Sequence, residues 1–282
     1  PTPDPMRPAA APLAENAPRI EPAHLEGFDG GPRFAVWWLP GDREPLGSVL
    51  CVQPIGAERT AARHALAAQA WRLARRGWAV LLLDLFGTGD SPGEPAEASL
   101  EGWRGDLLRA AMLARQRHAG PNVLWGVRAG ALLAADIAVA LDQLVDAYVF
   151  WQAPADGSMV AALPAEGGSL SPAMLAELAE LHMQPPHLDA RGTTPAVLFV
   201  DSDEAGAAPG GVSPSVASLT EQWLEAGYAA MPRTVSVPPF WVPSDIPGNP
   251  GAWSSATFAA LRPLLDEAYG LAAVSYTHLT LP

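Results

Sequence analysis

Apolar runs of strand length alternate with helical patterns along most of the chain, and this alternation limits the fold more than any other feature. The run WAVLLLDL (78–85) is almost uninterrupted, which is typical of a strand in a parallel sheet that helices cover on both faces. The pattern predicts one α/β domain with a doubly wound, mainly parallel sheet. Further strands are predicted at 33–40, 47–54, 122–127, 146–153, 196–201 and 233–240, and helices at 60–77, 99–118, 129–141, 172–183, 214–227 and from Trp253 onward.

The two ends of the chain differ in composition from this domain. Residues 1–22 are rich in Pro and Ala and are predicted to be a disordered leader. The last nine residues, VSYTHLTLP (274–282), interrupt a good helical pattern and resemble a translated cloning adapter. The domain is therefore placed at 23–272. Within it the interval 154–195, which is too long for a simple connection, is predicted to be a small cap insertion over the carboxyl edge of the sheet.

The charged residues exclude several classes of function. All 17 basic residues are Arg, against 30 acidic residues, so the formal charge is −13. A chain without Lys has no Schiff-base or pyridoxal chemistry and no P-loop. Without a basic footprint we expect no nucleic-acid partner. Because Cys51 is the only cysteine, an intrachain disulfide and a Cys-rich metal centre are also excluded.

The hydropathy of the chain bears on where the protein is found in the cell. No apolar run reaches the roughly 18 residues that a membrane helix needs. We therefore expect a cytoplasmic protein without membrane insertion. No sequence pattern calls for a cofactor or a metal ion, and none is expected.

The most specific motif lies in a loop that should follow the carboxyl end of a strand, where open α/β sheets bind ligands. The segment Gly126-Val127-Arg128-Ala129-Gly130 joins a predicted strand to a predicted helix, which is the setting of the nucleophile elbow G-x-S-x-G. Its small residues permit a tight turn that lifts the central side chain above the sheet. The central residue is Arg128, whose guanidinium stays protonated and cannot attack a carbonyl carbon. The frame of a nucleophile site is present, and the nucleophile is absent.

A Ser-His-Asp triad also needs an acid and a histidine. In α/β-hydrolases the chain order is nucleophile, acid, His. Asp201 and Asp203 stand where the acid would be. The last predicted strand is followed by Trp241 and Asp245, and the only His beyond Asp203 is His278 in the suspect tail. A Ser-His-Asp mechanism is therefore not expected.

The loop QPIGAER (53–59) is the place where hydrolases supply an oxyanion-hole N–H, although Pro54 has none to give. Glu58 lies close to where Arg128 should project, so an ion pair between them is predicted. The pair is either a static contact that fills a dead site or a charged site that grips a substrate. The residues expected to line a pocket here are Ile55, Gly56, Arg59 and, from the last loop, Trp241.

Other reactive side chains have ordinary explanations. Ser91 belongs to a Gly-rich loop, DLFGTGDSPG (84–93), and is expected to be a turn residue. Cys51 lies inside an apolar strand and is expected to be buried and inert. A metal or acid–base role for the two cap histidines is the alternative to a surface position. The histidines expected at the surface are His64, His118, His182 and His187.

Three segments carry a family resemblance: CVQPIGAERTAARHALAAQAWRLARRGWAVLLLDLFGTGDSPG, WGVRAGALLA and PPFW. Together they resemble the exosortase A system-associated hydrolase 2 family, an α/β-hydrolase-fold family from bacterial loci for exopolysaccharide production and PEP-CTERM protein sorting. The resemblance covers roughly 26–262 and implies that an Arg at the elbow is a family trait. The chain departs from it at QPIG (53–56), where relatives tend to show a Pro-Pro-Phe-like run. The residues at matching positions are Arg128, Glu58, Arg59, Trp241 and Asp245.

Two functions stay open on this basis. The first is an ester or thioester hydrolase, or an acyl transferase, in which Arg128 binds a carboxylate, phosphate or oxyanion beside a helix N-terminus. Glu58, Asp203 or Asp245 would then activate water as general base. The second is a non-catalytic protein that binds an acyl or anionic small molecule, or a partner protein from the same locus. The family's name reflects a fold, and a fold does not establish chemistry.

Overall fold

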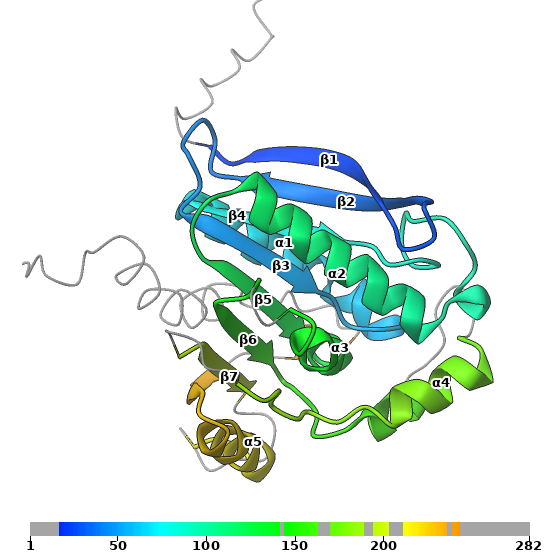
Figure 1. Cartoon of the computed structure of the whole chain (residues 1–282), viewed down its shortest axis with the longest axis vertical. Helices are drawn as coiled ribbons and strands as arrows, with labels where there is room; N and C mark the ends of the chain where they lie inside the picture. The colour runs from blue at the N-terminus through cyan, green and yellow to red at the C-terminus, as the bar shows by residue number, and fades with distance from the viewer. Residues whose placement is uncertain are drawn as a thin grey trace, which may run out of the picture.

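The computed structural model of the chain describes residues 17–141, 144–162, 170–188, 194–202, 211–235 and 239–242. Within them eight strands form one sheet in the order β1-β2-β4-β3-β5-β6-β7-β8 (Figure 1). Strands β3 to β8 all run parallel to one another, and β2 pairs antiparallel with both β1 and β4. The predicted mainly parallel α/β sheet is therefore confirmed, and β1 and β2 add an antiparallel hairpin to its edge.

The elements alternate along the chain as the periodicity predicts. None of the helices in the described ranges is long and apolar enough to cross a membrane. The strands are β1 (Arg19–Glu26), β2 (Pro32–Leu39), β3 (Gly47–Val52), β4 (Trp78–Leu83), β5 (Asn122–Val127), β6 (Ala147–Trp151), β7 (Ala196–Ser202) and β8 (Ala229–Val235). The helices are α1 (Ala57–Arg75), α2 (Leu100–Arg117), α3 (Ala129–Ala138), α4 (Pro172–Ala179) and α5 (Pro214–Glu225), with short 3-10 turns η1 (Pro95–Glu97) and η2 (Gly157–Ala162).

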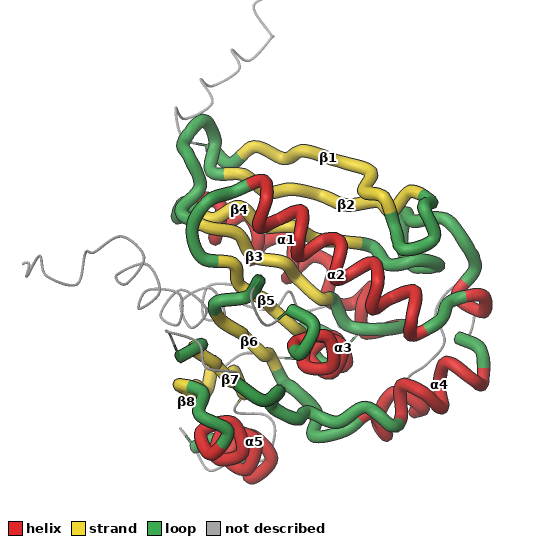
Figure 2. The backbone as a smooth tube through the Cα atoms, in the orientation of Figure 1, coloured by secondary structure: helices red, strands yellow, loops and turns green. Residues whose placement is uncertain are grey.

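Helices cover both faces of the sheet, and each face has its own apolar cluster. On one face α1 packs through Leu66 against side chains such as Trp125 of β5. On the other face α2, α3 and α5 pack against alternate residues such as Leu124. Figure 2 shows α4 at the lower right of the view, on the side to which the arrows of β5 and β6 point in Figure 1. The segment between β6 and β7 thus lies at the carboxyl edge, where the cap insertion was expected.

Two helix and strand boundaries differ from the sequence prediction. The first helix was expected to begin at residue 60, but α1 begins at Ala57 after Gly56, whose φ of 61° makes the turn. The last strand was expected at 233–240, but β8 starts at Ala229 because it pairs in register with β7. Smaller differences are that β3 ends before Pro54, and that α3 and α4 end before residues 141 and 183.

The predicted leader also overlaps ordered structure. Residues 19–22 belong to β1, and Arg19 pairs with Leu39 of β2. A strand at the edge of a sheet tolerates Pro22, which is why a Pro-rich composition misplaces the boundary. Residues 1–16 and 274–282 lie outside the described residues, as does the helix expected from Trp253.

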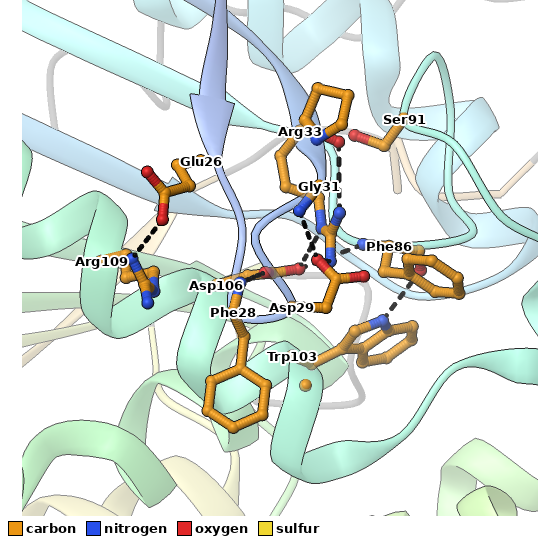
Figure 3. Close-up of polar contacts among 12 residues, drawn as sticks. Glu26, Phe28, Asp29, Gly31, Arg33, Phe86, Ser91, Trp103, Asp106 and Arg109 are labelled. Atoms are coloured by element: carbon orange, nitrogen blue, oxygen red, sulfur yellow. Dashed lines mark hydrogen bonds and ion pairs between the residues drawn. The ribbon is translucent and has the colours of Figure 1, made fainter.

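A buried polar network fastens the β1–β2 hairpin to the rest of the domain (Figure 3). Arg33 of β2 donates from Nε to Oδ2 of Asp106 on α2 at 2.7 Å, and the two side chains are 2% and 0% exposed. The same carboxylate accepts from the backbone N–H of Phe28 at 2.8 Å and of Phe86 at 3.3 Å. A buried ion pair is tolerated when its charges are also hydrogen-bonded, as these are. The carboxylate of Asp106 therefore joins the hairpin, α2 and the loop after β4 by hydrogen bonds.

Candidate functional site

The turn between β5 and α3 has the backbone geometry of a nucleophile elbow. Arg128 adopts φ 56° and ψ −129°, a conformation that L-residues rarely take and that costs of order 1–3 kcal/mol. A Cβ atom added at Gly126 would lie 2.6 Å from Cα of Ala131, and one at Gly130 would lie 2.3 Å from the carbonyl oxygen of Val52. Both glycines are thus required by close backbone approach, and the turn predicted from the motif is present.

The guanidinium of Arg128 is closed between a carboxylate and an indole ring. Its Nε lies 3.1 Å from Oε1 and 3.2 Å from Oε2 of Glu58, and its Nη2 lies 2.8 Å from Oε1. On the other side Cζ of Arg128 lies 5.2 Å from the ring centre of Trp241, a cation–π contact. The side chains of Arg128 and Glu58 are 19% and 10% exposed. The predicted ion pair is confirmed, and we call Glu58, Arg128 and Trp241 the Arg128 cluster.

The elements bring these three residues together from distant parts of the chain. Glu58 stands in the first turn of α1, where the helix dipole favours a carboxylate. Arg128 precedes α3, and its backbone N–H donates to the carbonyl oxygen of Trp151 at the end of β6 at 2.9 Å. Trp241 comes from the segment that follows β8 and is 8% exposed. Residues that follow β3, β5 and β8 in the chain therefore meet in one cluster, and the charges of Arg128 and Glu58 cancel.

A second ion pair stands beside the first. Nη2 of Arg59 contacts Oδ1 of Asp84 at 2.5 Å, so Arg59 pairs with the loop after β4 and not with Glu58. The Asp84 carboxylate also accepts from Nε2 of Gln53 at 3.1 Å and from the backbone N–H of Asp90 at 2.9 Å. Asp84 thus joins the loops that follow β3 and β4. Sequence reasoning gave Asp84 no such role, although its place at the head of a Gly-rich loop after a strand was a usable signal.

A cavity of about 370 Å³ opens beside the second pair, with Arg59 in its wall. Its charged side chains have partners: besides the Arg59–Asp84 pair, Arg63 contacts Asp90 at 3.2 Å. The predicted pocket residues Ile55, Gly56 and Arg59 do line it, whereas Trp241 does not. The walls are the loop after β3, the start of α1, the loop after β4, Trp103 and, from just before α4, Leu170.

Comparison with solved structures finds many of similar architecture. The protein Est1E from Butyrivibrio proteoclasticus, solved with ferulic acid bound, matches with a TM-score of 0.63 and 16% identity over 88% of this chain and 99% of that one. An α/β serine hydrolase without a lid from Xanthomonas campestris matches with a TM-score of 0.56 and 18% identity over 86% and 94%. The chain has the α/β-hydrolase fold.

A third solved structure also has a similar architecture. The Pyrococcus furiosus esterase Pf2001 has a TM-score of 0.59 and 12% identity, over 88% of this chain and 91% of that one. No protein-family model and no curated protein sequence matches the chain. At these identities the α/β-hydrolase fold is what the comparisons establish, and residue roles have to be argued from this chain's own geometry.

Asp201 stands where the acid of a Ser-His-Asp triad was expected, and both of its carboxylate oxygens accept hydrogen bonds within the fold. Asp201 is 1% exposed and ends β7. Its Oδ1 accepts from Nε2 of Gln152 at 2.8 Å, and its Oδ2 accepts from the backbone N–H of Ser213 at 2.7 Å. Asp203 and Asp245, which were predicted along with Glu58 as candidate general bases, lie outside the described residues.

The predicted structural residues of this fold behave as expected in two cases. Oγ of Ser91 donates to the carbonyl oxygen of Asp84 at 2.5 Å and accepts from the N–H of Phe34 at 2.8 Å, so Ser91 is a turn residue. Cys51 is 1% exposed, and burial raises the pKa of its thiol well above the usual value. Neither side chain is available as a nucleophile in the folded chain.

The histidines divide differently from the prediction. His118 was expected on a solvated helix face, but it is 8% exposed and packs edge-on to Trp37 at 5.3 Å between ring centres. Its position at the end of α2, turned toward β2, explains the error, and desolvation followed by the charge of Arg117 lowers its pKa. His182 and His187 are exposed as predicted. Within the described residues no group of three potential metal ligands occurs.

Proposed function

We propose that this chain is a member of the α/β-hydrolase fold that binds an acyl or anionic small molecule at the carboxyl edge of its sheet without cleaving it by nucleophilic attack. The observation that carries the proposal is the closed Arg128 cluster. The side chain raised by the elbow is a guanidinium, and both oxygens of Glu58 already hold it. A carboxylate engaged in this way is a poor general base, because accepting a proton would break the ion pair.

The cavity beside the cluster is the ligand site in this proposal. Its volume of about 370 Å³ suits a small molecule or one end of an acyl chain. Ile55, Trp103 and Leu170 give it apolar wall, and Thr60 and Thr88 bring hydroxyl groups. Glu58 stands between Gly56 and Arg59, which both line the cavity. In this proposal an anionic head group exchanges with Glu58 for the guanidinium while the apolar part stays in the cavity.

A second candidate is an ester or thioester hydrolase, or an acyl transferase, without a Ser-His-Asp triad. It is favoured by the retained elbow strain at Arg128, which a binding protein has no evident need to maintain. Solved relatives in fold that are called esterases or hydrolases add to it. In this candidate the pair opens when substrate enters, so that Arg128 stabilises an oxyanion and Glu58 activates water.

The resemblance to the exosortase A system-associated hydrolase 2 family extends the proposal to a setting. We infer that the chain serves an exopolysaccharide or PEP-CTERM sorting locus, with a partner protein from that locus. The Arg at position 128 in the run WGVRAGALLA supports this inference. Loss of exopolysaccharide export on deletion of the gene, restored by the intact chain, is the expected result in the source organism.

One pair of variants separates the two candidates. We would measure octanoate binding by calorimetry, and turnover of p-nitrophenyl octanoate and octanoyl-coenzyme A, for the intact chain, Glu58→Gln and Arg128→Met. If the chain is a binder, Glu58→Gln frees the charge of Arg128 and binds octanoate about tenfold more tightly, since one ion pair no longer competes. Arg128→Met then loses that binding, and no variant shows turnover.

Turnover by the intact chain that both substitutions abolish would establish the hydrolase candidate instead. Arg109→Met is the matched control, because its ion pair with Glu26 is exposed and neither residue lines the cavity or belongs to the Arg128 cluster. Turnover that all three substitutions leave unchanged would contradict both candidates at this site.

A further inference from the structure

Most arginines in the described part of the chain form an ion pair with Asp or Glu. Arg43, Arg72, Arg75 and Arg233 form none there, and the first three gather at the carboxyl-terminal end of α1. Arg72 and Arg75 are one helical turn apart. Nη2 of Arg43, from the loop between β2 and β3, donates to the carbonyl oxygen of Arg75 at 3.1 Å. The arginines that are ion-paired are Arg19, Arg33, Arg59, Arg63, Arg104, Arg109, Arg115, Arg117 and Arg128.

An exposed tryptophan completes this surface. Trp71 is 39% exposed, and Cζ of Arg75 lies 4.9 Å from its ring centre. Stacking on the ring fixes the guanidinium plane while leaving its outer N–H groups free to bind. We call Arg43, Trp71, Arg72 and Arg75 the basic–aromatic patch. Asp42 and Glu44 flank Arg43 and are exposed, but neither forms an ion pair with the patch in the described residues.

Helix capping alone does not account for the patch. Cations in the last turn of a helix are stabilised by its dipole, and α2 provides the comparison within the same molecule. Its last turn carries Arg115 and Arg117, which contact Asp146 at 3.1 Å and Glu21 at 2.6 Å. Arg117 also lies 4.9 Å over a tryptophan ring, but that ring, Trp37, is fully buried. On α1 the same Arg-on-Trp contact is at the surface and lacks the carboxylate.

We propose that the basic–aromatic patch is a docking site for an acidic segment of a partner protein. The guanidinium groups match carboxylates, and the exposed ring offers apolar contact to the side chains between them. The chain carries a formal charge of −13, so an acidic partner is repelled elsewhere and oriented toward this patch. A long polyanion or a membrane surface needs a wider basic footprint than three side chains.

The patch is separate from the candidate ligand site. Glu58 stands at the start of α1 and Arg75 at its end, which places them about 25 Å apart along a helix that rises about 1.5 Å per residue. A partner held at the patch therefore leaves the cavity and the Arg128 cluster accessible. The proposal stands whether or not the chain has a catalytic function.

A labelled deca-glutamate peptide provides the test. Fluorescence anisotropy should detect its binding to the intact chain, weakened at least about tenfold when salt rises from about 50 to about 300 mM. Arg72→Ser/Arg75→Ser should weaken binding at least about tenfold and Trp71→Ala about threefold. Arg115→Ser/Arg117→Ser on α2 removes the same charge and should leave binding unchanged. Circular dichroism melting curves check that each variant is folded.

Three results would overturn the proposal. One is absence of peptide binding to the intact chain at low salt. Another is equal weakening by the α1 and α2 double variants, which would mean that only net charge matters. The third is patch-dependent binding of phosphatidylserine vesicles or of an RNA oligomer when the peptide does not bind, which would assign the patch to a different class of partner.

Discussion

Replacing one member of the Arg128–Glu58 pair is expected to destabilise the fold about as much as replacing both. At an effective dielectric constant of about 20, unit charges about 4 Å apart attract by about 4 kcal/mol. A buried charge that loses its partner costs about 3–5 kcal/mol, and the 19% and 10% exposures of these side chains let water offset part of that cost. Arg128→Met and Glu58→Gln should therefore each lower the free energy of unfolding by about 2–3 kcal/mol. The double variant should lose no more, which corresponds to a coupling energy of about 2 kcal/mol.

Urea unfolding at neutral pH, followed by circular dichroism, measures all four members of this cycle. The exposed Arg63–Asp90 pair supplies the control, because its side chains are 64% and 58% exposed and its contact is 3.2 Å. That pair should couple by at most about 0.5 kcal/mol. If the Arg128–Glu58 pair couples no more strongly than the control, the pair does not close the elbow in solution, and the binding proposal loses its main support.

Three further outcomes follow from the packing and the pKa shifts. Gly130→Ala should cost about 3 kcal/mol, because its Cβ would meet a backbone carbonyl at 2.3 Å. Gly102→Ala on the surface of α2 should change stability by less than about 1 kcal/mol, and equal shifts of the melting temperature would refute the close approach. Stability should fall on acidification below the unfolded His pKa of about 6.5, because burial lowers the pKa of His118 and the unfolded chain takes up the proton first. Urea midpoints at about pH 5.5 and about pH 7.5 test this, and an identical fall in His118→Gln would show another group to be responsible. Cys51 should react with Ellman's reagent only after unfolding, because burial raises the pKa of its thiol. Rapid labelling of the native chain would contradict its buried position.

The sequence predicted those parts of the site that depend on neighbouring residues. The elbow could be recognised because Gly126, Arg128 and Gly130 are local to one turn and their spacing reports a close backbone approach. The contact with Glu58 followed from the parallel sheet, since β3 and β5 are adjacent and their carboxyl ends meet at one edge. Both inferences needed only periodicity and the geometry of parallel strands.

The parts that were missed or misplaced depend on distant packing. Arg59 lines the cavity as predicted, but its pairing with Asp84 was missed because it depends on how the loop after β4 folds back. The position of Trp241 over the guanidinium depends on the path of the chain after β8, whose own start was misplaced. His118 looked solvated by helical periodicity, but its position at the end of α2 lets it pack on β2. In each case tertiary contact outweighed the local pattern.

The buried Arg33–Asp106 pair has a consequence for how the chain matures during synthesis. The two residues are 73 positions apart, so at about 5–20 residues per second the ribosome adds Asp106 roughly 4–15 s after Arg33. Until then the arginine has no buried partner, and the first hairpin cannot settle on the sheet at little cost. The β1–β2 hairpin is therefore made well before it is completed, and a nascent chain that stalls before α2 leaves the guanidinium of Arg33 without its buried carboxylate.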